Sequence, residues 1–168
     1  YLLSAFRLFN IGMKGNGMIA YLKTKPYALH RDEGQKHQLI GAMILVKASS
    51  EQTGGVFNLF EVSCSPDFAT TFHNHYAEDV AIYVLEGALT FFWGSEKKGA
   101  VAGSYFFLPR GIPHGFRVEG STPAQILYLT IPAGFDRFVI EQEQPAKKSE
   151  SEMAAARHKI EILGPLPE

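Results

Sequence analysis

Short apolar runs separated by turn residues extend from about residue 27 to residue 132. Each run is shorter than a typical helix, and glycine, proline, serine or aspartate separates it from the next. Glycine permits the positive φ angles of tight turns, and proline presets the first corner of a turn. The pattern is typical of an antiparallel β-sandwich or barrel. It predicts eight strands, at residues 39–47, 57–62, 70–75, 81–85, 88–93, 104–108, 115–118 and 125–131.

Beyond residue 132 the apolar positions change to helical spacing. Phe135, Phe138 and Val139 predict a short amphipathic helix. A capping box formed by Ser149 and Glu152 predicts a second helix. This helix is predicted to carry Met153, Ala156 and Ile160 on one side. The chain therefore divides into an N-terminal extension (1–26), a barrel (27–132) and a C-terminal helical tail (133–168).

The net charge of −1 and the pI of about 6.7 predict no nucleic-acid partner and no attraction to an anionic membrane. No apolar stretch approaches the roughly 18 residues of a membrane span. The apolar start of the chain lacks the features of a signal peptide, and Met13 and Met18 suggest that residues 1–17 are upstream or non-native sequence. The single cysteine, Cys64, fits a reducing compartment, so a cytoplasmic location is expected.

Three histidines are the candidate chemical centre. His73 and His75 alternate along one predicted strand, so their side chains point to the same face. His114 follows an apolar strand and a stiff turn of proline and glycine. Neutral imidazole is a good ligand for zinc, copper, iron and nickel. The sequence therefore predicts a transition-metal site formed by His73, His75 and His114.

The segments around these histidines resemble the two conserved motifs of the cupin superfamily. The residues in register with those motifs are His73, His75, Gly87, Gly103, Pro109, Gly111 and His114. Over about residues 27–143 the sequence looks like single-domain cupins described as quercetin 2,3-dioxygenase-like. The resemblance implies an all-β fold, a jelly-roll antiparallel barrel also called a double-stranded β-helix, with short C-terminal helices. It also implies a homodimer.

One position departs from the cupin pattern. The family keeps a metal-binding glutamate seven residues before the glycine that matches Gly87, and that position is Val80 here. In quercetinase-like members this glutamate is also taken to act as a base toward a substrate hydroxyl. Valine supplies neither function, so a barrel that holds no metal remains an alternative. Glu78 shares strand parity with Val80 and is the one candidate for a substitute catalytic carboxylate.

The resemblance implies one divalent transition metal, and iron, nickel, manganese, cobalt, copper and zinc all remain compatible with imidazole ligands. The leading hypothesis is a quercetinase-like dioxygenase acting on a small aromatic or enol-bearing molecule. Its pocket is predicted to include Val80, Ile82 and Phe116. A metal-assisted isomerase, lyase or hydrolase with a three-histidine site is the second hypothesis. A non-catalytic cupin that binds a small molecule is the third.

Overall fold

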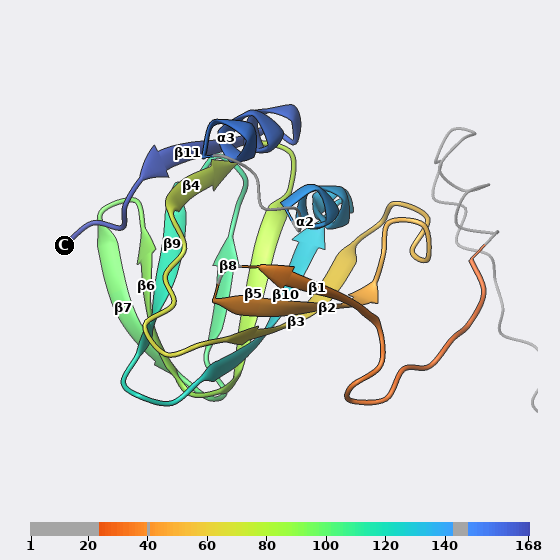
Figure 1. Cartoon of the computed structure of the whole chain (residues 1–168), viewed down its shortest axis with the longest axis horizontal. Helices are drawn as coiled ribbons and strands as arrows, with labels where there is room; N and C mark the ends of the chain where they lie inside the picture. Colours follow the sequence, from red (N-terminus) through yellow and green to blue (C-terminus); the bar gives the residue numbers. More distant parts are fainter. Residues whose placement is uncertain (1–23, 40, 143–147) are drawn as a thin grey trace, which may run out of the picture.

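The computed structural model describes residues 24–39, 41–142 and 148–168, most of which form two antiparallel sheets (Figure 1). In spatial order, the six-stranded sheet consists of β1 (Gln35–Leu39), β2 (Ala42–Ala48), β3 (Asn58–Cys64), β10 (Ala124–Ile131), β5 (Asp79–Glu86) and β8 (Tyr105–Leu108). The five-stranded sheet consists of β11 (Ile160–Gly164), β4 (Phe72–His75), β9 (His114–Glu119), β6 (Ala88–Trp93) and β7 (Glu96–Val101). Most of the predicted N-terminal extension, 1–26, lies outside the described residues.

The two sheets pack face to face, and the described helices α2 (Phe135–Gln142) and α3 (Lys148–Arg157) lie side by side at one end of the barrel (Figure 1). Strands that follow one another in the chain pass between the sheets, as β3 and β10 pair in one sheet while β4 and β9 pair in the other. This is the arrangement of a jelly roll. The predicted all-β fold with short C-terminal helices is therefore confirmed.

The core lies between the sheets and follows from the alternation of the strands. In β3 and β10 every second residue is buried, because successive side chains point to opposite faces of a strand. Phe60 and Ile126 fill the core from the six-stranded sheet, while Leu89 and Phe91 fill it from the other. The ring of Phe91 stacks on Phe106 with 4.1 Å between centroids. One continuous apolar cluster thus joins the two sheets.

Most of the strand predicted at residues 39–47 is β2, and a strand that was not predicted, β1, precedes it in a hairpin. Gly41 in the turn has a φ of 75°, a left-handed conformation that L side chains rarely adopt. A Cβ atom added there would lie 2.8 Å from the ring of Phe68. Leu39 pairs with Ala42 across the turn. The apolar run therefore reverses direction because one glycine permits it, which the hydrophobic pattern alone did not indicate.

The predicted C-terminal helix is too long, because it included Ile160. Helix α3 ends at Arg157, and Ile160 begins the strand β11. Its buried residues are Ala154 and Ala155, whereas Met153 is 54% exposed. The helix begins at Lys148, so Ser149 does not cap it. The open edge of β4 explains the strand, because β11 satisfies the backbone hydrogen-bonding groups of β4 by pairing with it.

The described surface has an apolar patch on the outer face of β5 and β8. Tyr83, Tyr105 and Phe107 are each more than two-fifths exposed there. On the opposite face of β8, Phe106 packs against the core. Phe92 on β6 is covered differently, since Lys97 and Arg117 both lie 5.6 Å from its ring centroid. The predicted homodimer stays a prediction.

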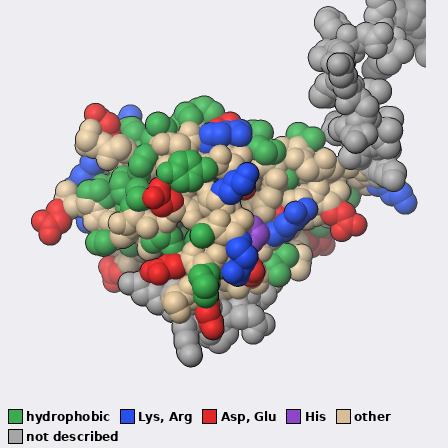
Figure 2. All heavy atoms as spheres, turned by 90° about the horizontal axis from the view of Figure 1, so that it is seen from above, with side chains coloured by type: hydrophobic (Ala, Val, Ile, Leu, Met, Phe, Trp, Pro, Cys, Tyr) green, Lys and Arg blue, Asp and Glu red, His purple; other side chains and the backbone are tan. Residues whose placement is uncertain are grey.

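Charged side chains of both signs occupy the face that carries α3, as Figure 2 shows. Within the described ranges, no helix combines the length and the apolar character needed to cross a membrane. The net charge of the whole sequence is −1. The absence of nucleic-acid and membrane partners stays a prediction.

Cys64 is expected to be unreactive in the folded protein. Its side chain is 1% exposed, and burial raises the pKa of its thiol to about 12. The reactive species is the thiolate, which is therefore scarce near neutral pH. Ellman's reagent at pH 8 should label Cys64 only after unfolding. A Ser95→Cys variant, with its thiol in an exposed turn, provides the positive control because it should react in the native state. Rapid native labelling of Cys64 in the parent protein would contradict this burial.

Candidate metal centre

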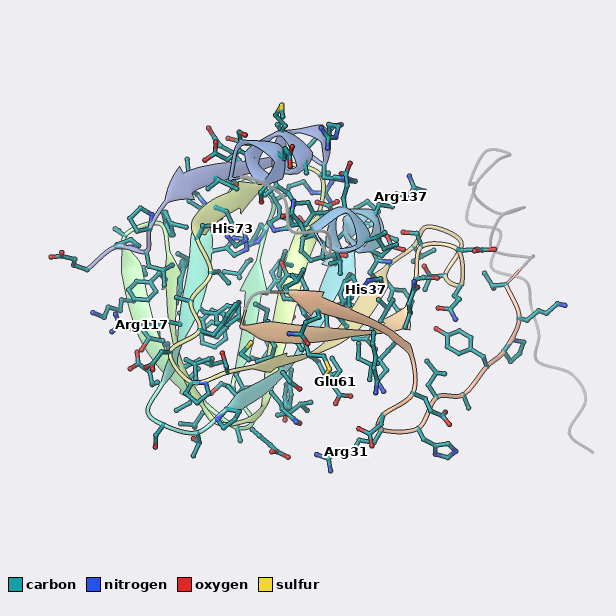
Figure 3. All side chains as sticks on the ribbon, viewed as in Figure 1. Arg31, His37, Glu61, His73, Arg117 and Arg137 are labelled. Atoms are coloured by element: carbon teal, nitrogen blue, oxygen red, sulfur yellow. The ribbon has the colours of Figure 1, made fainter. Side chains whose placement is uncertain are left out.

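The structure brings the three predicted histidines together inside the barrel. His73 and His75 lie on β4, and His114 begins β9 directly opposite His73. The centroids of the rings are separated by 5.1 Å (His73–His75), 4.7 Å (His73–His114) and 5.5 Å (His75–His114). One nitrogen atom from each ring can be chosen such that all three lie within 4.8 Å of one another. Figure 3 shows His73 between the sheets, whereas Arg31 and Arg117 lie at the periphery.

The outer nitrogen atoms of the rings are engaged by acceptors. Nδ1 of His73 lies 2.7 Å from the carbonyl oxygen of Thr71, and Nδ1 of His114 lies 2.8 Å from that of Ile112. A carbonyl oxygen can only accept, so both Nδ1 atoms carry the proton and both Nε2 atoms carry a lone pair. Nε2 of His114 is buried without a hydrogen-bond partner. Such an orphaned lone pair is what a metal ligand requires.

The local environment keeps these imidazoles neutral. Burial, together with the neighbouring His114 and His75, lowers the pKa of His73 to about 3. Burial likewise lowers the pKa of His114 to about 4. Both rings are therefore uncharged near neutral pH and able to donate an electron pair to a cation. The donor set of three imidazoles fits a divalent transition metal.

Two contacts hold the turn before β9 against β4 and β5. The backbone N–H of Gly111 donates to the carbonyl oxygen of His75 at 2.8 Å. Arg110 forms a bidentate pair with Asp79, at 2.9 and 3.0 Å, and this pair lowers the pKa of Asp79 to about 2. The turn that precedes His114 is thereby tied to the segment that follows His73, and His114 lies opposite His73. The sequence analysis assigned no role to Arg110 or Asp79.

The other predicted site residues occupy different positions. Ile82 and Phe116 line the cavity beside the histidines. Val80 is fully buried in β5, where it pairs with Leu108 and Thr130, and it is not among the residues that line this cavity. Glu78 is buried with Oε2 3.4 Å from Nδ1 of His75. Glu78 therefore contacts the outer side of His75 and does not belong to the three-residue cluster.

The histidines open into a largely apolar cavity of about 430 Å³, a volume within the range of small-molecule sites. Helix α2 supplies Phe135 and Phe138 to its wall. The helix is held in place by Asn58, whose Oδ1 accepts the backbone N–H of Gly134 at 2.8 Å. Strand β11 contributes two further apolar side chains, Ile160 and Ile162. The C-terminal segment therefore closes a pocket that the barrel strands begin.

Tyr128 and Phe135 are pocket residues that the sequence analysis did not identify. The hydroxyl of Tyr128 lies 3.4 Å from Nε2 of His75. The ring of Phe135 lies 5.3 Å from both the Tyr128 ring and the His75 ring. The alternation in β10 indicates that Tyr128 faces inward, but it does not indicate which core residues reach the histidines. The helix pattern likewise identifies Phe135 as apolar without placing it.

A larger groove of about 690 Å³ lies between the β2–β3 connection and α2. Its buried carboxylate, Asp136, accepts hydrogen bonds from the backbone N–H and the hydroxyl of Ser50. These contacts account for Asp136 as a structural link between the loop and the helix. No candidate metal cluster of the described chain lies in this groove.

Comparison with known proteins identifies relatives of the barrel. A family model described as a cupin domain matches residues 60–131, a span that includes all three histidines. Quercetin 2,3-dioxygenase from Bacillus subtilis (strain 168) is 27% identical over 103 residues, which are 61% of this chain and 31% of that protein. The chain thus spans about a third of the length of this relative.

Solved structures with the same fold carry different names. KdgF from a Halomonas species has a TM-score of 0.60 and 19% identity, with 67% of this chain and 99% of that chain covered. The polyketide cyclase RemF from Streptomyces resistomycificus has a TM-score of 0.58 and 20% identity, with 76% and 92% covered. At these identities the likeness establishes the fold and leaves the activity to be argued from the site.

Proposed function

We propose that this chain, whose residues 60–131 match a cupin-domain family model, is a metal-dependent oxygenase acting on a small, uncharged aromatic or enol-bearing molecule. The observation that carries this proposal is the cluster of three imidazoles at the wall of an apolar cavity. His73, His75 and His114 would hold one divalent metal ion through Nε2. The 27% identity to a quercetin 2,3-dioxygenase supports dioxygen as the co-substrate.

The lining of the cavity supports an uncharged substrate. Of the described residues that line it, none is lysine, arginine, aspartate or glutamate. A phosphate or carboxylate buried there would lack a cationic side chain to compensate its loss of hydration. The rings of Phe60, Phe135 and Phe138 instead offer surfaces for stacking. This favours a flat apolar molecule over a sugar phosphate or a small organic acid.

The residues around the substrate have separable roles. The bound metal would act as a Lewis acid that holds the substrate's oxygen atoms and lowers their pKa. Burial and the nearby carboxylate of Glu78 raise the pKa of Tyr128, so its hydroxyl keeps the proton and donates a hydrogen bond to a substrate oxygen. Phe135 packs on the substrate ring, and Ile82 and Phe116 help to exclude water.

A redox-neutral, metal-assisted isomerase, lyase or hydrolase is the second candidate, and Val80 favours it. With valine where cupins keep a glutamate, the ligand set contributes no negative charge of its own. A dication bound by three neutral imidazoles keeps its full charge, which suits Lewis-acid chemistry with zinc. This candidate requires neither dioxygen nor a change of oxidation state at the metal.

Oxygen uptake is expected when tag-free protein loaded with iron, nickel, manganese or cobalt is given uncharged flavonols or related enols. Sugar phosphates should give none, because among the described lining residues the cavity offers no cationic side chain to hold a phosphate group in addition to the proposed metal ion. Turnover should be slow, since no carboxylate takes the place of the usual glutamate base at position 80. An oxygen electrode with each metal and substrate pair makes the measurement.

The same panel separates the alternatives. Conversion of a substrate by the zinc-loaded protein without oxygen would favour the redox-neutral candidate and contradict the oxygenase. Absence of turnover with every pair, accompanied by ligand binding that is unchanged in a His73→Ala variant, would favour a binding protein without catalysis.

A further inference from the structure

Glu78 is a buried carboxylate whose position is explained by His75. It lies in the connection between β4 and β5, and its side chain is 6% exposed. Its Oε2 lies 3.4 Å from Nδ1 of His75. A Cβ atom added to Gly134 would lie 3.2 Å from Oε1 of Glu78, so a side chain at position 134 would crowd the other oxygen. Burying a carboxylate is costly unless a donor faces it, and the N–H of His75 is that donor.

In each of the three histidines Nδ1 faces a hydrogen-bond acceptor, and only in His75 does a side chain provide that acceptor. Nδ1 of His73 and of His114 each face a backbone carbonyl oxygen, at 2.7 and 2.8 Å. Nδ1 of His75 faces a carboxylate instead. On the other side of the His75 ring, Nε2 lies 3.4 Å from the hydroxyl of Tyr128. The proton on Nδ1 therefore fixes the tautomer in which Nε2 can bind a metal.

We propose that Glu78 is the outer partner of His75 and places beside the metal site the negative charge that Val80 does not supply. This inference rests on the metal site proposed above. A carboxylate behind a metal-ligating histidine orients its ring and raises its basicity, and losing such a partner typically costs about 10- to 100-fold in metal affinity. Glu78 is thus a positioning residue, since it acts through His75 and does not contact the ion.

The geometry distinguishes this role from direct ligation. The three histidines each offer a nitrogen within 4.8 Å of the other two, and Glu78 is not a member of that group. Its carboxylate contacts the nitrogen of His75 that faces away from the cluster. Position 80, where the family's ligand would lie, is an apolar core position beside Leu108 and Thr130. The negative charge is therefore at position 78 instead of position 80, and it belongs to a residue behind a proposed metal ligand instead of to a ligand.

Two substitutions test this role on tag-free protein. Glu78→Leu removes both the acceptor and the charge, whereas Glu78→Gln keeps an oxygen that accepts the N–H of His75. Glu86→Gln is the matched control, because Glu86 is exposed and its carboxylate pairs with Arg31. Zn²⁺ affinity is measured by competition with a chromogenic chelator. The tautomer of His75 is measured in metal-free protein by long-range ¹H–¹⁵N correlation spectra of the imidazoles.

Glu78→Leu is expected to weaken Zn²⁺ binding by about 10- to 100-fold. The His75 signals should lose the pattern of a single Nδ1–H tautomer. Glu78→Gln should keep that pattern and recover part of the affinity, and Glu86→Gln should match the parent protein. A twofold or smaller change in Glu78→Leu would overturn the role, and so would a loss as large as that in a His75→Leu variant, which would make Glu78 a ligand.

Failure of the proposed function would be recognisable in the same experiment. A parent protein that binds no Zn²⁺ would contradict the metal site, and with it the outer-partner role. A parent protein that binds Zn²⁺, together with an unaltered His75 tautomer and affinity in Glu78→Leu, would overturn only the inference about Glu78.

Discussion

A His114→Leu variant is expected to lose Zn²⁺ and Co²⁺ affinity by more than about 100-fold while keeping its fold. The loss should exceed the roughly 10- to 100-fold effect of removing an outer partner, because a ligand itself is lost. In the metal-free form, leucine removes the unpartnered Nε2 and leaves the carbonyl oxygen of Ile112 without its donor. These effects oppose each other, so the free energy of unfolding should change by only about 1 kcal/mol.

Thermal unfolding with and without metal makes this loss visible. Zn²⁺ at about 100 times its dissociation constant should stabilise the parent protein by about 2.7 kcal/mol, or roughly 5–10 °C in Tm. His114→Leu should show almost none of this shift under the same conditions. A His30→Ala variant, altered at an exposed position, should retain it. An undiminished shift in His114→Leu would show that the metal binds elsewhere.

A Val80→Glu variant is expected to make the stability of the protein depend strongly on metal. Val80 is completely buried, so an unpaired carboxylate there should destabilise the metal-free form by about 3–5 kcal/mol. A cation held by the three histidines would offset the new charge. Because about 1.4 kcal/mol corresponds to a tenfold change in affinity, relief of about 3 kcal/mol would strengthen Zn²⁺ binding by about 100-fold.

Val84→Glu is the matched control for this substitution. Val84 is also completely buried on β5 and faces the same side, and four residues along a strand place it about 13 Å from Val80. Chemical denaturation should show similar destabilisation of both metal-free variants, with rescue by Zn²⁺ in Val80→Glu alone. Equal rescue of both variants, or of neither, would contradict the expectation that a carboxylate at position 80, unlike one at position 84, reaches the metal site.

The fold was predictable where local pattern and tertiary packing agree. The strict alternation in β3 and β10 reflects one buried and one outward face. Strand β7 was missed because it is an exposed edge, with Lys97 and Lys98 outward and Ala100 as its one buried residue. Strand β11 was missed because its pairing partner, β4, lies more than 80 residues earlier in the chain. A strand that depends on a distant edge has a weak local signal.

The candidate site was predictable in its ligands and not in their surroundings. Alternation placed His73 and His75 on one face, and the spacing of the second motif placed His114 near them. The side of His75 that Glu78 contacts depends on the path of the loop between β4 and β5, which strand parity does not describe. The contact between the hydroxyl of Tyr128 and Nε2 of His75 likewise depends on how the two sheets pack. Both contacts follow from tertiary structure.

Anomalous diffraction from crystals of tag-free protein prepared with Co²⁺ tests the central claim most directly. Data collected on both sides of the cobalt absorption edge should give one strong peak per chain. We expect that peak between the Nε2 atoms of His73, His75 and His114, at about 2.0–2.2 Å from each, as for imidazole bound to similar divalent ions. A peak at another position, or electron density without cobalt between the three rings, would contradict the account.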